Sequence, residues 1–513
     1  MDTTKKHHMY AAVIFTIPML CWLFVVVVTE PLYPPRYLAL LDVMEQTPSN
    51  PLLLGALLSG LGLAMLVLKF ISKFLHSEFQ GAPFKTFIRG SKMVSGGKLC
   101  RLTKVKEAQI SIAGIPMPKK IEPLHVLING ATGTGKSVLL RELVLSALCR
   151  GDRMVIVDPN GDMLSKFGTD KDLILNPYDG RTQGWSFLNE IRHDYDFHRY
   201  ALSIVPRGRT DEAEEWASYG RLLLRETAKK LALIGNPSVH ALFHWTTIEA
   251  PEKLREFLQG TLAESLFAGS SEATRALSSA RFVLSDKLSE HLSMPEGEFS
   301  IRSWLEQEST GNLYITWRED MSVALKPLIS AWVDLLCTSV LSLSEHDPSP
   351  IWLIIDELAS LEKLASLEAA LTKGRKHGLR VVAGLQSTSQ VNDIYGATAA
   401  QTLRSCFRTL VVLGGSRTDP KTNEDMSLCL GEHEVERVLY NHNEGIKTSR
   451  TRSVQTVRER VVTPTELAHL PELIAYVAFA GAFPITSVPL KIQQYPQTML
   501  AFEGCSPCLA ISC

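Results

Sequence analysis

The chain has 513 residues, enough for two or three domains and an ample hydrophobic core. Its formal net charge is −1, which excludes nucleic-acid binding through overall charge, so any basic footprint has to be local. The nine cysteines are scattered and suggest no disulfide framework, as expected for a largely cytosolic protein with reduced thiols.

Two apolar segments near the N-terminus predict a membrane hairpin. Met9–Thr29 carries no charge, and a second span over residues 51–70 is uncharged from Pro51 to Leu68. Each is close to the length needed to cross the hydrocarbon core. A cleaved signal peptide does not fit the first segment, because its apolar run is too long and a second span follows soon after. We therefore expect residues 1–75 to form a two-helix membrane anchor.

The positions of Lys and Arg predict the orientation of this anchor. Lys5 and Lys6 precede the first span and only Arg36 lies between the spans. After the second span come Lys69, Lys73, Lys85, Arg89 and Lys92. Because cytoplasmic loops carry the excess of basic residues, both ends should be cytoplasmic, with a short periplasmic loop between the spans. The predicted location is the bacterial inner membrane, with the bulk of the chain in the cytoplasm.

Small residues in the second span have the spacing that lets membrane helices approach closely. The pairs are Gly55 with Ser59 and Gly60 with Ala64. They could serve packing within the hairpin or between subunits, or they could simply face lipid. The sequence leaves these alternatives open.

From residue 124 onward, an apolar run, a glycine-rich loop and a helical pattern follow one another. Residues 130–137 read GATGTGKS. This order is typical of a P-loop, in which backbone N–H groups and the positive end of a helix dipole face nucleotide phosphates. Lys136 is expected to reach the β- and γ-phosphates, and Ser137 to ligate Mg²⁺. The expected nucleotide-binding residues are Gly130, Ala131, Thr132, Gly133, Thr134, Gly135, Lys136, Ser137 and Val138.

Beyond the P-loop, apolar strand-like runs alternate with helical patterns. This predicts an α/β nucleotide-binding domain with a mostly parallel sheet covered on both faces. Strand-like runs vanish between about 184 and 297, where helical periodicity takes over. We therefore expect an all-helical domain at 184–297, inserted between two parts of the nucleotide-binding domain at 76–183 and 298–513. The expected strands are Leu124–Ile128, Met154–Val157, Leu173–Leu175, Leu313–Thr316, Trp352–Ile355, Arg380–Leu385, Thr409–Leu413, Ile474–Ala478 and Val488–Gln493.

A second motif completes the predicted nucleotide site. The apolar run Ile351–Ile355 ends in Asp356 and Glu357. Alone, such a strand could end in two solvated acids, but together with the P-loop it predicts nucleotide hydrolysis. Asp356 is expected to hold the Mg²⁺ shell with Ser137, and Glu357 to orient and deprotonate the attacking water. The acidic turn Asp158–Asp162, at another strand end, should lie near the nucleotide.

Two further positions are candidates for the same reaction. Arg375 lies in the basic turn Lys373–His377, after the helix that follows the Asp-Glu strand. In ring-shaped ATPases an arginine here can be a finger that reaches the neighbouring subunit's γ-phosphate, and the alternative is a solvated helix end. Gln386 ends the strand Arg380–Leu385, where it could sense the γ-phosphate or merely begin a helix.

A local basic segment follows residue 444. It is rich in Ser, Thr and Asn, and we expect a loop over a channel in which Lys447, Arg450 and Arg452 contact DNA phosphates; a solvated loop is the alternative. Aromatic residues of the predicted helical domain could stack on bases, but their helical spacing favours the core. They are Trp216, Tyr219, Phe243 and Trp245.

In order and content, these motifs resemble the type IV coupling proteins of bacterial conjugation. The resemblance covers nearly the whole chain: the membrane hairpin, GATGTGKS at 130–137, IVDPNGD at 156–162, LNPYDGRTQGWSFLNEI at 175–191, IIDELASL at 354–361, KGRKHG at 373–378 and GLQS at 384–387. It implies a RecA-like fold and a homo-hexameric ring around a channel. It also implies a DNA-stimulated ATPase that uses ATP and Mg²⁺ to drive DNA from a relaxase complex, the relaxosome, into a type IV secretion channel.

The resemblance implies the same site residues. Lys136 and Ser137 would bind phosphate and Mg²⁺, and Asp356 with Glu357 would be the acidic pair. Arg375 would be the finger in trans. Gln386 would be the sensor.

Two other functions remain open at this stage. One is a related ring ATPase that translocates proteins or other DNA, although the short hairpin and the helical insert argue against a chromosome motor. The other is a membrane receptor or adaptor in which ATP binding only gates assembly, although Glu357 argues for hydrolysis. No base-reading motif is visible, so DNA binding is expected to be independent of sequence.

Overall fold

The computed structural model describes residues 3–29, 43–45, 47–74, 84, 86–208, 210–307, 311–346, 348–443 and 449–504. The chain divides into two compact units. One comprises residues 1–86 with 437–454, and the other comprises residues 87–436 with 455–513.

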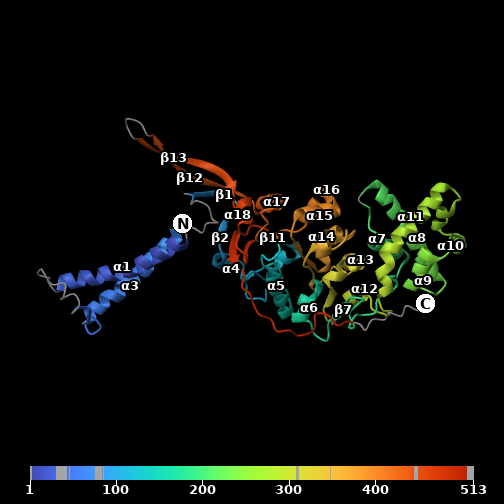
Figure 1. Ribbon diagram of the computed structural model, residues 1–513, viewed down its shortest axis with the longest axis horizontal. Helices are drawn as coiled ribbons and strands as arrows, with labels where there is room; N and C mark the ends of the chain where they lie inside the picture. The colour runs from blue at the N-terminus through green and yellow to red at the C-terminus, as the bar shows by residue number, and fades with distance from the viewer. Residues whose placement is uncertain are drawn as a thin grey trace. The chain divides into compact units, whose positions relative to one another are not determined.

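Two long helices of the first unit, α1 (Thr3–Thr29) and α3 (Pro51–Phe74), pack along each other (Figure 1). Each contains a stretch of 19 residues, Ala11–Thr29 and Pro51–Lys69, that is long and apolar enough to cross a membrane. Most of their large apolar side chains are exposed in the hairpin, as expected for helices whose outer surface meets lipid.

The small residues of α3 divide between two faces. At Gly60 the two helices approach so closely that a Cβ atom would lie 2.6 Å from the Cα of Pro18. Ala64, one turn further on, is buried, whereas Gly55 and Ser59 are exposed and Gly55 has open space around it. The Gly60–Ala64 pair therefore serves packing within the hairpin, and the Gly55–Ser59 pair faces outward.

A mostly parallel sheet of ten strands forms the centre of the described part of the second unit. The seven strands from β11 to β7 run parallel, and β14 pairs antiparallel with both β11 and β15. Across the sheet, the order is β2 (Met93–Ser95), β15 (Ile485–Pro489), β14 (Ile474–Ala478), β11 (Thr409–Val412), β5 (Val126–Asn129), β10 (Leu379–Leu385), β9 (Ile351–Ile355), β6 (Arg153–Pro159), β8 (Leu313–Trp317) and β7 (Leu173–Leu175).

Successive residues of the central strands enter opposite hydrophobic clusters. Leu353 and Ile355 belong to one cluster, whereas Trp352 and Ile354 belong to the other. Both faces are therefore covered, as is usual for parallel sheets, and this confirms the predicted α/β class. The covering helices are α4 (Gly96–Thr103), α5 (Lys136–Arg150), α6 (Asp162–Phe167), α12 (Ile301–Glu306), α13 (Ser322–Val340), α14 (Leu367–Lys373), α15 (Thr388–Tyr395), α16 (Ala397–Ser405), α17 (Pro420–Leu430) and α18 (Pro464–Ala468).

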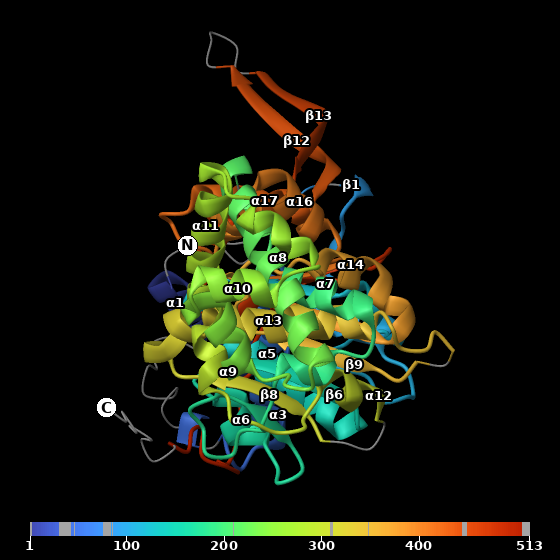
Figure 2. The same ribbon diagram turned by 90° about the vertical axis from the view of Figure 1, so that its right-hand side faces the viewer.

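Between β7 and β8 the described chain is helical. Its main helices gather at one side of the unit (Figures 1 and 2). The two ends of the segment meet, because the N–H of Phe299 donates to the carbonyl of Gly184 at 3.1 Å. These helices are α7 (Asp194–Ile204), α8 (Asp211–Leu233), α9 (Val239–Phe243), α10 (Pro251–Phe257) and α11 (Ser271–Leu288).

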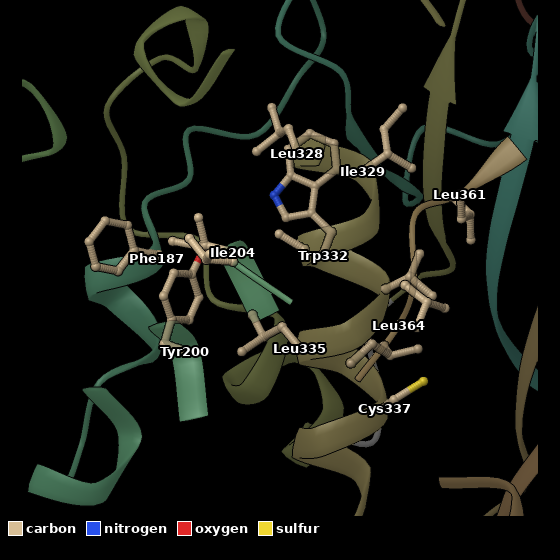
Figure 3. Packing of buried hydrophobic residues seen from close by; sticks show 14 of the residues in the cluster. Phe187, Tyr200, Ile204, Leu328, Ile329, Trp332, Leu335, Cys337, Leu361 and Leu364 are labelled. Atoms are coloured by element: carbon tan, nitrogen blue, oxygen red, sulfur yellow. The ribbon is translucent and has the colours of Figure 1, made fainter. Parts of the chain in front are cut away.

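Helix α13 joins this helical segment to the sheet. Its side chains point both toward Tyr200 and Ile204 of α7 and toward Leu361 and Leu364, which follow β9 (Figure 3). The segment thus shares one hydrophobic core with a face of the sheet, and a separate domain over 184–297 stays a prediction. Residues Glu319–Val340 are also apolar enough to span a membrane, but 72% of the apolar 18-residue window within that stretch is buried inside the unit.

Two predicted elements were wrong. The segment around Lys447, expected as a loop, is flanked by two long strands, β12 (Glu432–Asn443) and β13 (Ser449–Arg460), which form a three-stranded sheet with β1 (Thr86–Gly90). In β12 the described buried positions are His433 and Val435, and the described side chains of β13 are partly or fully exposed, so the ribbon gives too short an apolar alternation to predict a strand. The last predicted strand, Val488–Gln493, lies instead at Ile485–Pro489, because the central strand β14 fixes the register of its neighbour.

Candidate nucleotide-binding site

A cleft of about 690 Å³ lies at the carboxyl edge of the parallel strands. Strands β5, β9 and β10 end there together, since Ile128 pairs with Gly384 and Ala383 pairs with Ile355. The cleft brings together residues of both sequence motifs with Gln386: Thr132, Lys136, Ser137, Asp356, Glu357 and Gln386.

The glycine-rich loop links β5 to α5 at the floor of the cleft. Gly133 and Gly135 have positive φ values of 82° and 113°, which residues with a side chain rarely adopt. Helix α5 begins at Lys136, so the free N–H groups of its first turn face the cleft. Neighbouring strands hold the loop in place, because the N–H of Ala131 donates to the carbonyl of Gly414 at 2.9 Å.

Lys136 and Glu357 form an ion pair across the cleft. The Nζ atom of Lys136 lies 2.6 Å from Oε2 of Glu357, and both side chains are largely buried. Gly384 in β10 permits this approach, since a Cβ atom there would lie 1.8 Å from the carbonyl oxygen of Asp356 and 3.1 Å from Cδ of Lys136. The P-loop lysine and the acidic motif therefore contact each other directly.

Asp356 and Glu357 each keep one buried carboxylate oxygen without a hydrogen-bond partner in the described part of the chain. Burial raises the pKa of Asp356, and the nearby Lys136 opposes this shift. Buried oxygens of this kind are costly unless a cation or donor meets them. They suit Mg²⁺, which prefers oxygen ligands, so the residues present fit a metal–nucleotide complex together with Ser137.

The acidic turn after β6 borders the same cleft. Asp162 forms a two-point ion pair with Arg141 of α5, at 2.8 and 3.0 Å. Asp158 is buried, and this burial raises its pKa to about 7 although the N–H of Leu164 donates to it at 2.8 Å. The turn thus fastens α5 to β6 beside the P-loop.

Gln386 directly follows β10 and reaches the P-loop. The hydroxyl of Thr132 donates to Oε1 of Gln386 at 3.1 Å. The side chain that follows β10 is thus hydrogen-bonded to the loop that is expected to surround the phosphates.

Arg375 does not lie in this cleft. It belongs to the short helix η8 (Gly374–His377), which precedes β10, whereas Gln386 follows the same strand. At about 3.3 Å per residue, the length of β10 separates these two positions by roughly 20 Å. Arg375 is exposed, and among the described residues its guanidinium forms no ion pair.

Sequence motifs did not identify two residues that line the cleft. Lys326 comes from α13 and Trp317 ends β8. Neither belongs to a recognisable motif, because a lysine within a helix and a tryptophan at a strand end carry no spacing that indicates a nucleotide site. Only the observation that β8 is a parallel strand, whose carboxyl end meets the others, could have pointed to Trp317.

The predicted DNA contacts are described only in part. Lys447 lies outside the described residues. Arg450 and Arg452 are in strand β13, and the placement of their side chains is not described. Their role stays a prediction.

Residues 109–491 match the protein family described as the type IV secretion-system coupling protein DNA-binding domain. The structure is similar to that of the bacterial conjugative coupling protein TrwBdeltaN70, with 70% sequence identity, a TM-score of 0.80, and coverage of 83% of this chain and 98% of that chain. The plasmid coupling protein TrwB in complex with ADP and Mg²⁺ gives 70% identity and a TM-score of 0.79, with coverage of 83% of this chain and 100% of that one.

Among curated proteins, the coupling protein TraD of Escherichia coli (strain K12) is 30% identical over 413 residues, which cover 77% of this chain and 56% of TraD. The conjugal transfer protein TraG of Agrobacterium fabrum is 32% identical over 118 residues, which cover 23% of this chain and 18% of TraG. The chain thus spans about half the length of TraD, and a smaller part of TraG.

Proposed function

The chain belongs to the family of type IV secretion-system coupling proteins, and on this premise we propose that it is an ATP-driven DNA motor of bacterial conjugation. In this proposal it forms a homo-hexameric ring at the inner membrane, anchored by α1 and α3, with its bulk in the cytoplasm. It links a relaxase–DNA complex to a type IV secretion channel and moves DNA without reading its sequence.

The observation that carries the proposal is the Lys136–Glu357 ion pair, at 2.6 Å, beside carboxylate oxygens that have no hydrogen-bond partner among the described residues. Such a cleft is built to receive a charged group that separates the pair. TrwB has been solved in complex with ADP and Mg²⁺ and with the ATP analogue ADPNP, and it is about 70% identical to this chain. ATP and Mg²⁺ are therefore the proposed cofactors.

The proposed hydrolysis uses four side chains of the cleft. Lys136 leaves Glu357 to bind the β- and γ-phosphates, and the freed Glu357 carboxylate orients a water molecule and accepts its proton. Ser137 and Asp356 hold Mg²⁺, which neutralises the charge that develops on the phosphates. Gln386 senses the γ-phosphate through its contact with Thr132.

Arg375 is proposed to act in trans. Because it lies at the amino end of β10, it is out of reach of the cleft in its own chain. A ring of identical subunits brings the amino edge of one sheet near the carboxyl edge of the next without symmetry conflict, since such contacts are head-to-tail. An arginine finger raises the hydrolysis rate by roughly 10³–10⁵ in the systems studied, so isolated subunits should hydrolyse ATP poorly.

The test is the ATPase rate as a function of protein concentration, with full-length protein in detergent, with and without single-stranded DNA. We expect a rate that rises faster than linearly with concentration and that DNA shifts to lower concentration. The stimulation should fall steeply with salt, because phosphate contacts release counterions. A low rate that is linear in protein and indifferent to DNA would contradict the motor and favour a receptor in which ATP only gates assembly.

A further inference from the structure

The basic turn that carries Arg375 is fastened to the rest of its unit on both sides. It is the helix η8, between α14 and β10. Arg375 itself is exposed, whereas two histidines are buried: His125 is 1% exposed and His377 is 9% exposed. Each histidine donates a hydrogen bond to a backbone carbonyl next to the turn or facing it.

His125 fastens the chain just before the turn. Its Nε2 atom lies 2.8 Å from the carbonyl oxygen of Leu371, and the N–H of Val381 donates to its Nδ1 atom at 3.0 Å. Because Nδ1 accepts, Nε2 carries the proton and donates. Leu371 lies in the last turn of α14, where helix carbonyls lack intrahelical partners. His125 thus ties the end of α14 to the base of β5, the strand that leads into the P-loop.

His377 fastens the other end. Its Nδ1 atom lies 2.6 Å from the carbonyl oxygen of Leu343, which follows α13. A carbonyl only accepts, so Nδ1 carries the proton at this histidine. The two histidines therefore hold the turn through opposite ring nitrogens, with Arg375 left free between the two anchors.

We propose that His125 and His377 are positioning residues that fix the turn so that Arg375 is presented to the cleft of the neighbouring subunit. The inference rests on the proposed function, in which Arg375 acts in trans. Neither histidine lines the nucleotide cleft of its own subunit. A finger works at hydrogen-bonding distance, and a displacement of about 1 Å can lower the rate roughly 10²-fold.

Amide substitutions at the two positions give opposite expectations. A Gln amide reaches about as far as Nε2 and an Asn amide about as far as Nδ1. His125→Gln should therefore keep most of the ATPase rate and His125→Asn should lower it at least roughly tenfold. His377→Asn should keep the rate and His377→Gln should lower it. Nucleotide affinity should stay unchanged in all four variants.

Thermal stability distinguishes positioning from folding. His125 has a φ of 59° and a ψ of 158°, a conformation outside the left-handed helical region that neither Asn nor Gln favours. Backbone strain should therefore lower the melting temperature of both variants by similar amounts, whereas the ATPase rate should be higher in His125→Gln. If activity follows stability at this position, the histidine only supports the fold and the inference is wrong.

Mixed rings separate this inference from the function on which it rests. Lys136→Thr subunits keep a finger but lose their own cleft chemistry, so they should restore ATPase when mixed with Arg375→Ala, and equally with His125→Asn or His377→Gln. In a random equal mixture about a quarter of the head-to-tail interfaces are productive. If Arg375→Ala is rescued and the histidine variants are not, the inference fails. If no mixture is rescued, the trans assignment fails, and the inference with it.

His291 provides the matched control. It is buried to 2% exposure in the helical segment, and neither ring nitrogen has a hydrogen-bond partner among the described residues. His291→Gln should change stability without lowering the ATPase rate tenfold. A comparable loss of rate in this variant would show that any buried histidine has the same effect, and would overturn the proposal.

Discussion

The Lys136–Glu357 ion pair makes a binding residue and the proposed base depend on each other. While the two are paired, the carboxylate that should activate water is occupied. In the proposed mechanism, phosphates would compete for Lys136, so nucleotide binding itself would release the base. This coupling would limit water activation to a loaded cleft, because Glu357 would become free only when Lys136 binds other negative charge.

Replacing Glu357 by Gln tests this role. The amide keeps the size of the side chain but cannot take a proton, so turnover should fall by roughly 10²–10⁴-fold while ATP still binds. The measurement is steady-state ATPase together with equilibrium binding of ADPNP. If turnover falls less than tenfold, another group serves as the base.

Asp158 gives a prediction on pH and stability. Its pKa is raised by burial to about 7, against an ordinary value of about 3.9 in the unfolded chain. The folded protein therefore holds this proton more tightly, and stability is lost as pH rises from about 4 to 7. Asp158→Asn should remove this loss, raising the melting temperature of the nucleotide-free protein more at pH 8 than at pH 5. Equal shifts at both pH values would contradict the assignment.

At the residue scale, the sequence predicted what lies in contiguous motifs. Lys136, Asp356, Glu357 and Gln386 meet in the structure because parallel strands place their carboxyl ends together. Lys326 could not be predicted, since its place in the cleft depends on how α13 packs. The histidine anchors of Arg375 depend on ring nitrogens meeting carbonyls far away in sequence.

Among the elements, the membrane hairpin shows that only some of its small residues lie where the two helices pack together. A side chain at Gly60 would collide with the backbone of Pro18, whereas Gly55 has open space around it. Gly60→Val should push α3 away from α1 and expose Cys21, whose Cβ lies 3.1 Å from the position of the added Cβ. Peptide-resolved alkylation of Cys21 in detergent should rise in Gly60→Val and stay unchanged in Gly55→Val. Equal alkylation of Cys21 in the two variants would mean that the Gly60–Ala64 pair does not set the distance between α1 and α3.

The polar ribbon of β12 and β13 is the proposed DNA-contacting element. Changing Lys447, Arg450 and Arg452 to Glu should weaken binding of single-stranded DNA. It should also reduce the slope of log affinity against log salt by about 2, since each lost phosphate contact contributes about 0.7. Arg458→Ala is the control, because this arginine is paired with Glu432 at 2.5 Å. An unchanged slope in the triple variant would exclude these residues from the DNA interface.

The elements also show which strands the sequence pattern predicts and which it misses. Strands such as β7 and β14 were predicted with their observed bounds, because strands in a closed core are continuous apolar runs. Strands β12 and β13 were missed for the opposite reason. Their pairing depends on backbone hydrogen bonds and local ion pairs, such as that between Arg460 and Glu432 at 3.1 Å, which leave no hydrophobic period.

For the whole molecule, the proposed catalysis in trans predicts that two kinds of defective subunit have different effects on a ring. A Lys136→Thr subunit still offers a finger, so adding it in excess should leave the ATPase rate per wild-type cleft nearly unchanged. An Arg375→Ala subunit withdraws a finger, so excess should lower that rate toward its own basal level. Titrating each variant into wild-type protein at fixed total concentration measures both. Equal inhibition by the two variants would mean that ATP hydrolysis requires every subunit of the ring to be intact, rather than occurring independently at each interface.

Helix α13 poses a problem during synthesis that the finished fold conceals. A ribosome making this chain delivers two candidate spans to the insertion machinery and later a third, less apolar stretch, Glu319–Val340, that is still long and apolar enough to span a membrane. Asp334 lies within that stretch and is buried in the folded unit, where the hydroxyl of Ser203 donates to it at 2.6 Å. In a bilayer such a carboxylate would cost roughly 2.5–3.5 kcal/mol. The same acid that the core satisfies would therefore disfavour insertion of α13 into lipid during synthesis.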